Sequence, residues 1–377
     1  MHVVIVGAGI MGCAVGWTLA REGVRVTLLE KAVPGAEASS AAAGILGAQC
    51  EADGPGPLLD LFLHSRALWP AFAADLFTAT GIDVHLRLAG PATGVLEVFT
   101  DAESRAAGAL RETWMRAAGL RAAVVDGPGA CALEPALATA VFGGLHLPDD
   151  GRVDPRPLAR AVALAAANAG AVFRNGMVLD AIDTQDGRVT GVRCGTEALA
   201  ADAVVLAAGA WTDLLPASAP RRAAIHPVHG QLVLLAPRPG APGERPLQRV
   251  LVWHGSEGQQ GGYLVPRVDG TIIAGATTEQ TGYQKQVTAG GLQHVLTVAN
   301  RLMPGLRDAV VLEHWSGLRP RSTDGMPLLG PHPHLQGLHL AAGHYRNGIL
   351  LAPVTARVVA DAVLGRTQPF DLAPFRP

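Results

Sequence analysis

The sequence predicts an α/β protein in which a Rossmann-like nucleotide-binding domain, assembled from three segments, is interleaved with an antiparallel-sheet domain. An apolar run at residues 2–6 leads through a glycine-rich turn into a helical pattern, which is typical of a buried parallel strand and its helix. Residues 92–100, 225–235 and 262–277 instead show the alternating or β-rich patterns of an antiparallel sheet. Apolar strand-like runs return between and after these stretches, so the two domains interleave along the chain.

The composition is that of a globular protein with a large core. Its 377 residues are 49% hydrophobic, which excludes disorder as the main state. The 30 basic and 32 acidic residues nearly cancel to a net charge of −2, so no excess positive field exists to attract phosphate. We therefore expect no nucleic-acid partner and no membrane partner.

The four cysteines argue against a metal site and a disulfide framework. Cys13, Cys50, Cys131 and Cys194 are far apart and show no CxxC spacing. No apolar run of about 18 residues is free of charge, glycine or proline, and the chain begins with a strand pattern instead of a leader. We expect a reduced, cytoplasmic protein without a metal.

The first elements form a strand–turn–helix–strand unit. His2–Val6 is the first strand, Gly7–Gly12 the turn and Cys13–Arg21 the helix. Val24–Leu29 is a second buried strand, and Glu30 closes it. This is the order of elements expected in a βαβ unit.

The turn matches the GxGxxG fingerprint of dinucleotide-binding proteins. Gly7 permits the tight turn, Gly9 lets the backbone approach a pyrophosphate, and Gly12 allows close packing of the helix. The helix N-terminus then faces the anion, while Glu30 accepts from ribose hydroxyls. FAD and NAD share this ribose, and an ordinary βαβ unit with glycine turns is the plain alternative, so the motif alone does not choose.

Apolar strand patterns and a helical pattern like those of the first unit recur in the second half of the chain. Ala203–Ala207 and Leu338–Ala342 are predicted buried strands. A helix fits Ile349–Leu364, with Pro353 near its first turn, where a missing N–H costs little. Pro237–Pro246 is rich in proline and glycine and is expected to be an exposed loop.

These patterns predict how the chain divides. The nucleotide-binding domain comprises residues 1–84, 150–224 and 316–377. The substrate-binding domain comprises residues 85–149 and 225–315, which contain the stretches with an antiparallel-sheet pattern.

Six strings spread over nearly the whole chain carry a family resemblance. They are Ser39–Ala48 (SSAAAGILGA), Asp149–Pro155 (DDGRVDP), Val204–Thr212 (VVLAAGAWT), Ser316–Pro320 (SGLRP), Thr323–Pro327 (TDGMP) and Gly343–Pro353 (GHYRNGILLAP). Together they resemble the D-amino-acid-oxidase superfamily of FAD-dependent oxidoreductases, and more narrowly the glycine oxidases of thiamine biosynthesis. The resemblance implies that the nucleotide-binding domain holds FAD.

The resemblance also implies which residues contact FAD. The segment that begins at His344 opens a helix, whose free N–H groups and partial positive end suit the anionic charge of reduced flavin. A tight strand-to-helix turn without a ligand is the alternative for that segment. Besides Gly7, Gly9 and Gly12, the implied contacts are Ile10, Met11, Glu30, Lys31, Ser39, Ser40, Ala43, Gly44, Ile45, Val178, Gly209, His344, Tyr345, Arg346, Asn347, Gly348, Ile349 and Leu350.

At the substrate, the resemblance implies Arg319, Tyr263 and Arg346. A guanidinium fork binds a carboxylate through two parallel hydrogen bonds, which an ammonium cannot do, and so fixes the orientation of Cα. Arg319 matches the family's carboxylate-binding arginine, Arg346 a second arginine and Tyr263 their phenol partner. A solvated surface arginine and a tyrosine that only packs in its strand are the ordinary alternatives.

One position departs from the family pattern. Two residues before Tyr263, where glycine oxidases can carry a histidine, this chain has Gly261. The missing side chain predicts a more open pocket, so sarcosine, other N-alkylglycines and small D-amino acids join glycine as candidate substrates.

The implied reaction is FAD-dependent oxidative deamination of glycine or another small amino acid or N-alkylglycine. A hydride passes from Cα to flavin N5, the imine hydrolyses, and O₂ is reduced to H₂O₂. The alternatives are a D-amino-acid dehydrogenase of the same fold that uses a quinone or carrier, a non-catalytic flavin- or nucleotide-binding module, and an NAD-dependent dehydrogenase. The expected partners are a small amino acid and O₂, and a homo-oligomer is an open alternative to a monomer.

Overall fold

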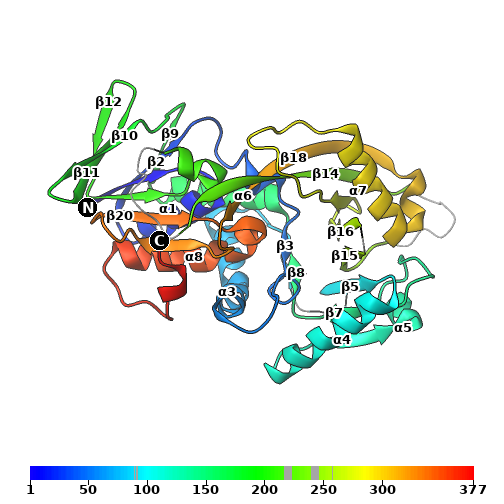
Figure 1. Cartoon of the computed structure of the whole chain (residues 1–377). Coiled ribbons are helices and arrows are strands. Elements are labelled where there is room, and N and C mark those ends of the chain that lie inside the picture. Colours follow the sequence, from blue (N-terminus) through cyan, green and yellow to red (C-terminus); the bar gives the residue numbers. More distant parts are fainter. Residues whose placement is uncertain (89, 91, 216–222, 239–245, 257) are drawn as a thin grey trace.

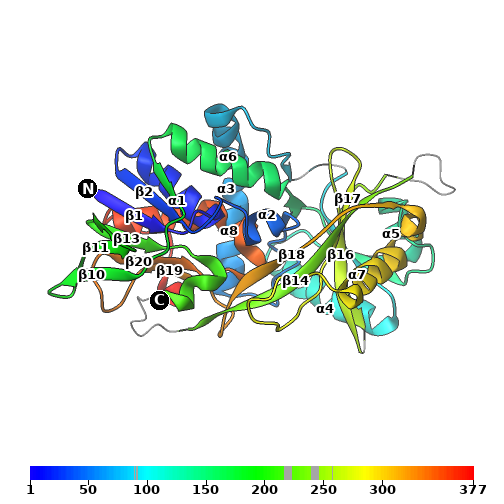
Figure 2. The same cartoon turned by 90° about the horizontal axis from the view of Figure 1, so that it is seen from above.

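Two large sheets lie side by side in the protein (Figure 1). The computed structural model describes residues 1–88, 90, 92–215, 223–238, 246–256 and 258–377. Seen from above, the long strands β14 (Ile225–Ala236) and β18 (Val310–Ser322) of the second sheet extend toward the first sheet (Figure 2). The predicted loop at 237–246 lies mostly outside the described residues.

The first sheet is a six-stranded, mainly parallel sheet in the order β19-β20-β13-β1-β2-β9. Only β19 runs antiparallel to its neighbour. Its strands are β1 (His2–Val6), β2 (Arg25–Glu30), β9 (Val172–Asn175), β13 (Ala203–Leu206), β19 (Leu328–Pro331) and β20 (Leu338–Ala342).

Helices and a small sheet cover the two faces of this sheet. Val3, Ile5 and Leu28 point into one core with the helices, whereas Val4 and Val6 point into the other. Burial on both faces explains why these strands are apolar without alternation. The helices on the first face are α1 (Ile10–Arg21), α3 (Pro57–Thr80), α6 (Pro155–Asn168) and α8 (Gly348–Val363), and the opposite sheet is β10 (Ala181–Gln185), β11 (Arg188–Cys194) and β12 (Glu197–Ala200).

The second sheet has eight strands in the order β18-β14-β17-β16-β15-β5-β7-β6. All its neighbouring strands are antiparallel except the pair β15 and β5. Its other strands are β5 (Val95–Phe99), β6 (Ala123–Asp126), β7 (Gly143–Leu147), β15 (Val250–Ser256), β16 (Gln259–Pro266) and β17 (Ile272–Gly275). Helices α5 (Gly127–Leu133) and α7 (Ala289–Leu302) pack in one core of this sheet, and Met115 of α4 (Ala102–Ala117) packs in another.

Short elements complete the chain. Strands β3 (Ile45–Leu46), β4 (Arg87–Leu88) and β8 (Gly151–Arg152) form a small sheet. The remaining helices are α2 (Ala38–Ala41) and the 3₁₀ turns Gly209–Leu214, Pro304–Asp308, Tyr345–Asn347 and Ala373–Phe375.

The mixed α/β class and the two kinds of sheet agree with the prediction. Every strand of the first sheet comes from residues 1–84, 150–224 or 316–377. The second sheet takes its strands from 85–149 and 225–315, but β18 crosses the predicted boundary at residue 316. The division into two domains stays a prediction, with one continuous strand joining its two parts.

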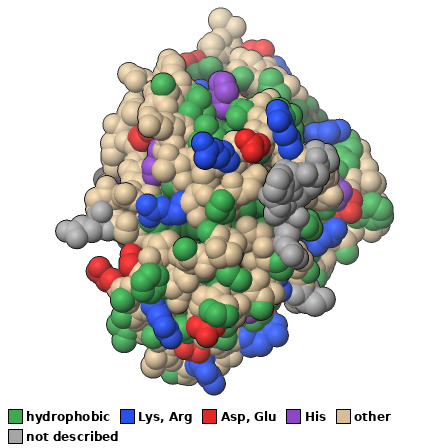
Figure 3. Space-filling model, turned by 90° about the vertical axis from the view of Figure 1, so that its right-hand side faces the viewer, with side chains coloured by type: hydrophobic (Ala, Val, Ile, Leu, Met, Phe, Trp, Pro, Cys, Tyr) green, Lys and Arg blue, Asp and Glu red, His purple; other side chains and the backbone are tan. Residues whose placement is uncertain are grey.

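The surface agrees with the near-neutral composition. On the face drawn in Figure 3, basic and acidic side chains are scattered among neutral ones and form no single basic field. Among the helices of the described ranges, none is long and apolar enough to cross a membrane.

Helix α8 begins at Gly348, one residue before the predicted Ile349, and contains Pro353 in its interior. Proline interrupts the backbone hydrogen bonds of a helix. Ser65 of α3, which is fully buried, lies beside this interruption: its hydroxyl donates to the Leu350 carbonyl at 2.6 Å and accepts from the Val354 N–H at 3.4 Å. The indole of Trp69 donates to the same carbonyl at 3.0 Å. Two side chains of α3 therefore satisfy the helix next to its proline.

We predict that Ser65→Ala lowers the free energy of unfolding of the FAD-loaded protein by about 1–3 kcal/mol. The Leu350 carbonyl keeps its bond from Trp69, but the buried Val354 N–H loses the hydroxyl that accepts its hydrogen bond. Urea unfolding measures this change. Thr297→Ala is the control, since that exposed hydroxyl bonds only its own helix. Equal stability of the Ser65→Ala and Thr297→Ala proteins would contradict the account.

Candidate functional site

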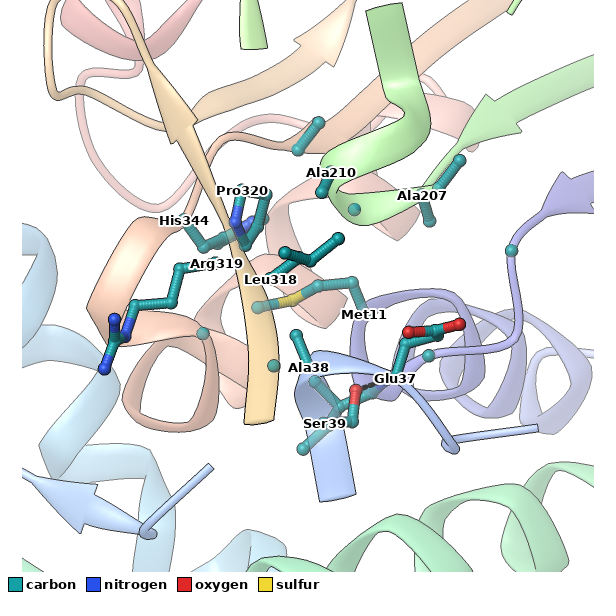
Figure 4. Close-up of a pocket in the computed structure, with 18 of the residues that line it drawn as sticks. Met11, Glu37, Ala38, Ser39, Ala207, Ala210, Leu318, Arg319, Pro320 and His344 are labelled. Atoms are coloured by element: carbon teal, nitrogen blue, oxygen red, sulfur yellow. Dashed lines mark hydrogen bonds between the residues drawn. The ribbon is translucent and has the colours of Figure 1, made fainter. Parts of the chain in front are cut away.

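A cavity of about 380 Å³ lies where the two sheets meet. Its floor is formed at the carboxyl ends of β1, β2, β13 and β20, which is where open α/β sheets bind ligands. The wall opposite this floor is formed by β14, β16 and β18 of the second sheet. In the close-up, Arg319 of β18 lies on the opposite side from Glu37 and Ser39 (Figure 4).

The glycine-rich turn lines one end of the cavity. Gly7 has a φ of +100°, and a methyl group built onto it would lie 2.5 Å from the Ala207 carbonyl oxygen. A methyl group on Gly12 would lie 1.9 Å from the Gly7 carbonyl oxygen. Both positions therefore require glycine if β1, α1 and β13 are to pack as they do.

The N-terminus of α1 opens onto the same end. Gly9 is its N-cap and supplies no capping side chain, while the Ile10 N–H donates to the Ser39 hydroxyl at 2.9 Å. First-turn N–H groups that lack helical partners, together with the helix dipole, make such a terminus suited to an anion.

Glu30 and Lys31 follow at the end of β2. Glu30 is buried, lines the cavity, and accepts from the backbone N–H groups of Ala8 and Ala32, both at 3.0 Å. A carboxylate has about four acceptor positions, so these two bonds leave capacity for a ligand hydroxyl. The Lys31 ammonium lies 3.3 Å from the centre of the Trp211 ring, which also lines the cavity.

Arg319, Arg346 and Tyr263 line the other end of the cavity. The Arg319 guanidinium donates to the Thr277 carbonyl at 3.1 Å, and that of Arg346 donates to the Thr278 hydroxyl at 3.0 Å. Burial raises the pKa of the Tyr263 phenol, although the two arginines act to lower it. Tyr263 is therefore a neutral O–H donor at neutral pH, beside two cations.

Two strand glycines make room for these side chains, and the sequence reasoning missed both. A methyl group on Gly230 would lie 2.4–2.6 Å from the Arg319 guanidinium, and one on Gly275 would lie 2.9–3.0 Å from the Tyr263 ring. Glycine inside a predicted strand often marks such a close approach, so the signal was present. Glu51 was also missed, and it lines the cavity with the two arginines.

His344 stands at the end of β20, behind the turn that leads into α8. Its ring is buried and lies 3.0 Å from the Thr355 hydroxyl, measured from Nε2 to Oγ1. Burial lowers the pKa of His344 to about 3, so the ring is neutral at physiological pH. The turn thus presents backbone N–H groups and Arg346, with no second cation from His344.

Most of the predicted cofactor residues line this one cavity. Gly12, Ser40 and Leu350 are the exceptions, since Gly12 packs on Gly7, Ser40 donates to the Gly35 carbonyl, and Leu350 is fully buried. The predicted residues that do line it are Gly7, Gly9, Ile10, Met11, Glu30, Lys31, Ser39, Ala43, Gly44, Ile45, Val178, Gly209, His344, Tyr345, Arg346, Asn347, Gly348 and Ile349.

The expectation that Gly261 opens the pocket is wrong. Gly261 is absent from the described lining of the cavity, and a methyl group on it would lie 2.0 Å from the Trp253 carbonyl oxygen. The position faces the backbone of β15, where only glycine fits. A histidine here would displace a strand and would not reach the end of the cavity that Arg319 and Tyr263 line.

Comparison with known proteins identifies the family. The model of the family described as FAD dependent oxidoreductase matches residues 2–362. The chain belongs to this family. A glycine oxidase from Geobacillus kaustophilus is 40% identical over 375 residues, which cover 99% of this chain and 95% of that protein. A bifunctional protein ThiO/ThiG from Synechocystis sp. is 38% identical over 96% of this chain and 51% of its own length.

A solved structure shows the same fold. The crystal structure of glycine oxidase from Geobacillus kaustophilus superposes with a TM-score of 0.91 at 38% identity, over 99% of this chain and 97% of that one. Family and fold together make this chain an FAD-dependent enzyme of amino-acid oxidation. The cavity fits such a dinucleotide, since Gly7 and Gly12 of the turn admit no side chain and the N-terminus of α1 lines it.

We predict that Gly12→Ala prevents stable FAD binding, because its methyl group cannot coexist with the Gly7 carbonyl in the present turn. Flavin absorbance per protein after gel filtration measures this. Gly290→Ala is the matched control, since it also lies in the first turn of a helix and its methyl group would meet no atom within 4 Å. Full flavin occupancy in Gly12→Ala would contradict the role given to the turn.

Proposed function

We propose that the chain is an oxidase of glycine or another small amino acid or N-alkylglycine, with FAD as its cofactor and O₂ as its electron acceptor. The proposal rests on one observation. Arg319, Arg346 and Tyr263 lie at one end of a cavity, and a glycine turn of the dinucleotide-binding type lies at its other end. Its similarity to glycine oxidases over nearly the whole chain supports the substrate class.

In this proposal the cavity residues divide by their distance from the glycine turn. Gly7, Gly9 and the N-terminus of α1 hold the pyrophosphate, and Glu30 binds the adenosine ribose. The turn from His344 to Gly348 leads into α8, whose first-turn N–H groups have no side-chain cap from Asn347. These groups offer hydrogen bonds and a partial positive charge to an electron-rich ring edge.

Arg319 and Arg346 hold the substrate carboxylate, and the neutral phenol of Tyr263 donates to it. Two guanidinium groups neutralise a carboxylate, and their planar forks restrict its rotation. Fixing the carboxylate fixes Cα, which is the reacting atom. When bound, FAD accepts a hydride from that carbon and afterwards passes two electrons to O₂.

The rival is a dehydrogenase of the same fold that passes its electrons to a quinone or carrier. No described residue of the cavity lining favours it over the oxidase. A cytoplasmic location and assembly into a homo-oligomer stay predictions from the sequence.

An anaerobic flavin-bleaching screen tests the proposal. Glycine, sarcosine and a set of small D-amino acids are added in turn to the FAD-loaded protein, and air is then admitted. The expected result is bleaching by at least one of them, followed by rapid recovery of the yellow colour with one H₂O₂ per flavin. Bleaching without recovery in air would favour the dehydrogenase, and no bleaching by any amino acid would contradict the proposal.

We predict that Arg319→Ala lowers kcat/KM by about two to four orders of magnitude, because a partly dehydrated carboxylate loses a charged partner worth about 3–5 kcal/mol. Arg319→Lys recovers part of the loss, since a point charge cannot reproduce the fork. FAD binding survives in both. The control is Arg307→Ala, which removes an exposed arginine. Activity of Arg319→Ala within a fewfold of the parent would make Arg346 the leading anchor.

A further inference from the structure

Three acidic side chains line the cavity, and two of them are engaged. Glu30 accepts from two backbone N–H groups, as described above. Glu37 forms ion pairs with Lys285 at 3.0 Å and Lys31 at 3.8 Å. Both acids lie toward the glycine turn and the adenosine end of the cavity.

Glu51 is the third acid, and it stands at the substrate end. Within the described ranges of the chain, its carboxylate makes no hydrogen bond and no ion pair within 4 Å. It is nevertheless close enough to act electrostatically on Arg346, whose pKa it raises against the opposing effect of burial. A partly exposed, uncommitted carboxylate thus shares a cavity with two guanidinium groups.

Buried charges hold the backbone on both sides of Glu51. Asp150 has no exposed surface, and its carboxylate accepts from the N–H groups of Gln49 at 3.0–3.1 Å and Cys50 at 2.8 Å. Arg66 of α3 donates to the same carboxylate at 2.8 Å and to the Gln49 side chain at 2.9 Å.

A second buried pair holds the carbonyl groups of the same turn. Arg111 of α4 donates to the carbonyl oxygens of Gln49 at 2.9 Å, Cys50 at 3.1 Å and Ala52 at 3.4 Å. Its charge is balanced by the buried carboxylate of Glu97 on β5. The turn that carries Glu51 is therefore fixed from two sides.

Removing the carboxylates of Asp150 and Glu97 from water is costly, and one known role of such ion pairs is to fix a single geometry. Of residues 46–52, only Glu51 lines the cavity. The two pairs hold the segment that presents Glu51, and they leave Glu51 itself without a protein partner. Among the described residues no cation is bonded to this carboxylate, and the two arginines are available for an anionic group of the ligand.

An α-amino acid supplies that cation. Its carboxylate and its protonated nitrogen lie on neighbouring atoms, so a carboxylate anchored by Arg319 and Arg346 places the nitrogen nearby. We propose that Glu51 binds the substrate nitrogen and thereby selects substrates with a basic amine. This inference rests on the proposed function and adds the determinant for the other half of the substrate.

The substrate class follows from this chemistry. Primary and secondary amines both carry a positive charge and at least two N–H groups when protonated, so glycine and N-alkylglycines satisfy Glu51. A hydroxy acid or a simple carboxylic acid offers the arginines the same carboxylate but gives Glu51 no cation. It leaves a carboxylate facing an uncharged group, which is unfavourable in a partly dehydrated cavity.

The test compares two ligands of the FAD-loaded protein that differ in the amine. The dissociation constant of acetate is measured from its perturbation of flavin absorbance, and the half-saturating glycine concentration from anaerobic bleaching. Glu51→Gln is expected to raise the glycine value about ten- to a hundredfold, as for loss of a hydrogen bond to a charged group. The dissociation constant of acetate is expected to stay within threefold of the parent value or to fall, because Glu51→Gln removes a negative charge near the bound acetate.

Two further variants make the result specific. Glu51→Asp keeps the charge on a shorter chain and is expected to recover part of the glycine affinity. Asp53→Asn removes the same charge two residues away on an exposed side chain and is expected to change neither ligand.

Each other outcome overturns the inference. Equal weakening of glycine and acetate in Glu51→Gln would mean that Glu51 only supports Arg346. No change in either would mean that Glu51 does not reach the substrate. In both cases the parent protein is still bleached by glycine, so the proposed function stands. A parent protein that no amino acid bleaches would overturn the proposed function, and this inference with it.

Discussion

The site depends on neutralising negative charge at two separated places inside one cavity. At one end, the N-terminus of α1 presents its first-turn N–H groups, of which that of Ile10 donates to the Ser39 hydroxyl. At the other, Arg319 of β18 and Arg346 of the turn before α8 bring two guanidinium groups to the same cavity. Backbone dipoles suit a diffuse phosphate charge, whereas forked side chains suit a small carboxylate that must not rotate. The fold brings the two together because strands β14, β16 and β18 of the second sheet line the cavity opposite the carboxyl ends of the strands of the first sheet.

This arrangement requires glycine where two segments, or a segment and a side chain, approach closely. Gly7 and Gly12 let β1, α1 and β13 approach closely, and Gly230 and Gly275 leave room for the side chains of the substrate end. At each of these positions, any other residue would add a side chain for which the turn or the strand leaves no room. Buried ion pairs play the complementary part at the turn before Ala52, where they fix backbone that has little regular structure.

The sequence predicted the elements whose patterns are local. Strands β1 and β20 begin and end at the predicted residues, because both are short apolar runs bounded by glycine or charge. The carboxylate-binding role proposed for Arg319 was available only from the family resemblance, since composition alone favours a solvated arginine. The structure adds that Arg319 lies in the same cavity as the glycine turn.

What the sequence could not predict depends on contacts between distant residues. Pro353 sits in the interior of α8 because Ser65, far away in the chain, satisfies the helix beside it. The prediction for Gly261 failed because the pairing of β15 with β16 decides which atoms a side chain at this position would meet. The spacing from Tyr263 in the sequence does not reveal that pairing. Glu51 carries no motif, and its place is fixed by Asp150 and Arg111 from other elements.

The central claim is that one cavity holds the dinucleotide at the α1 end and an amino-acid carboxylate at the Arg319 end. A crystal structure of the FAD-loaded protein soaked in acetate tests it most directly. The account predicts the pyrophosphate against Gly7 and Gly9, and the acetate carboxylate between the guanidinium groups of Arg319 and Arg346. Flavin filling the space beside Tyr263, or acetate bound away from both arginines, would contradict it.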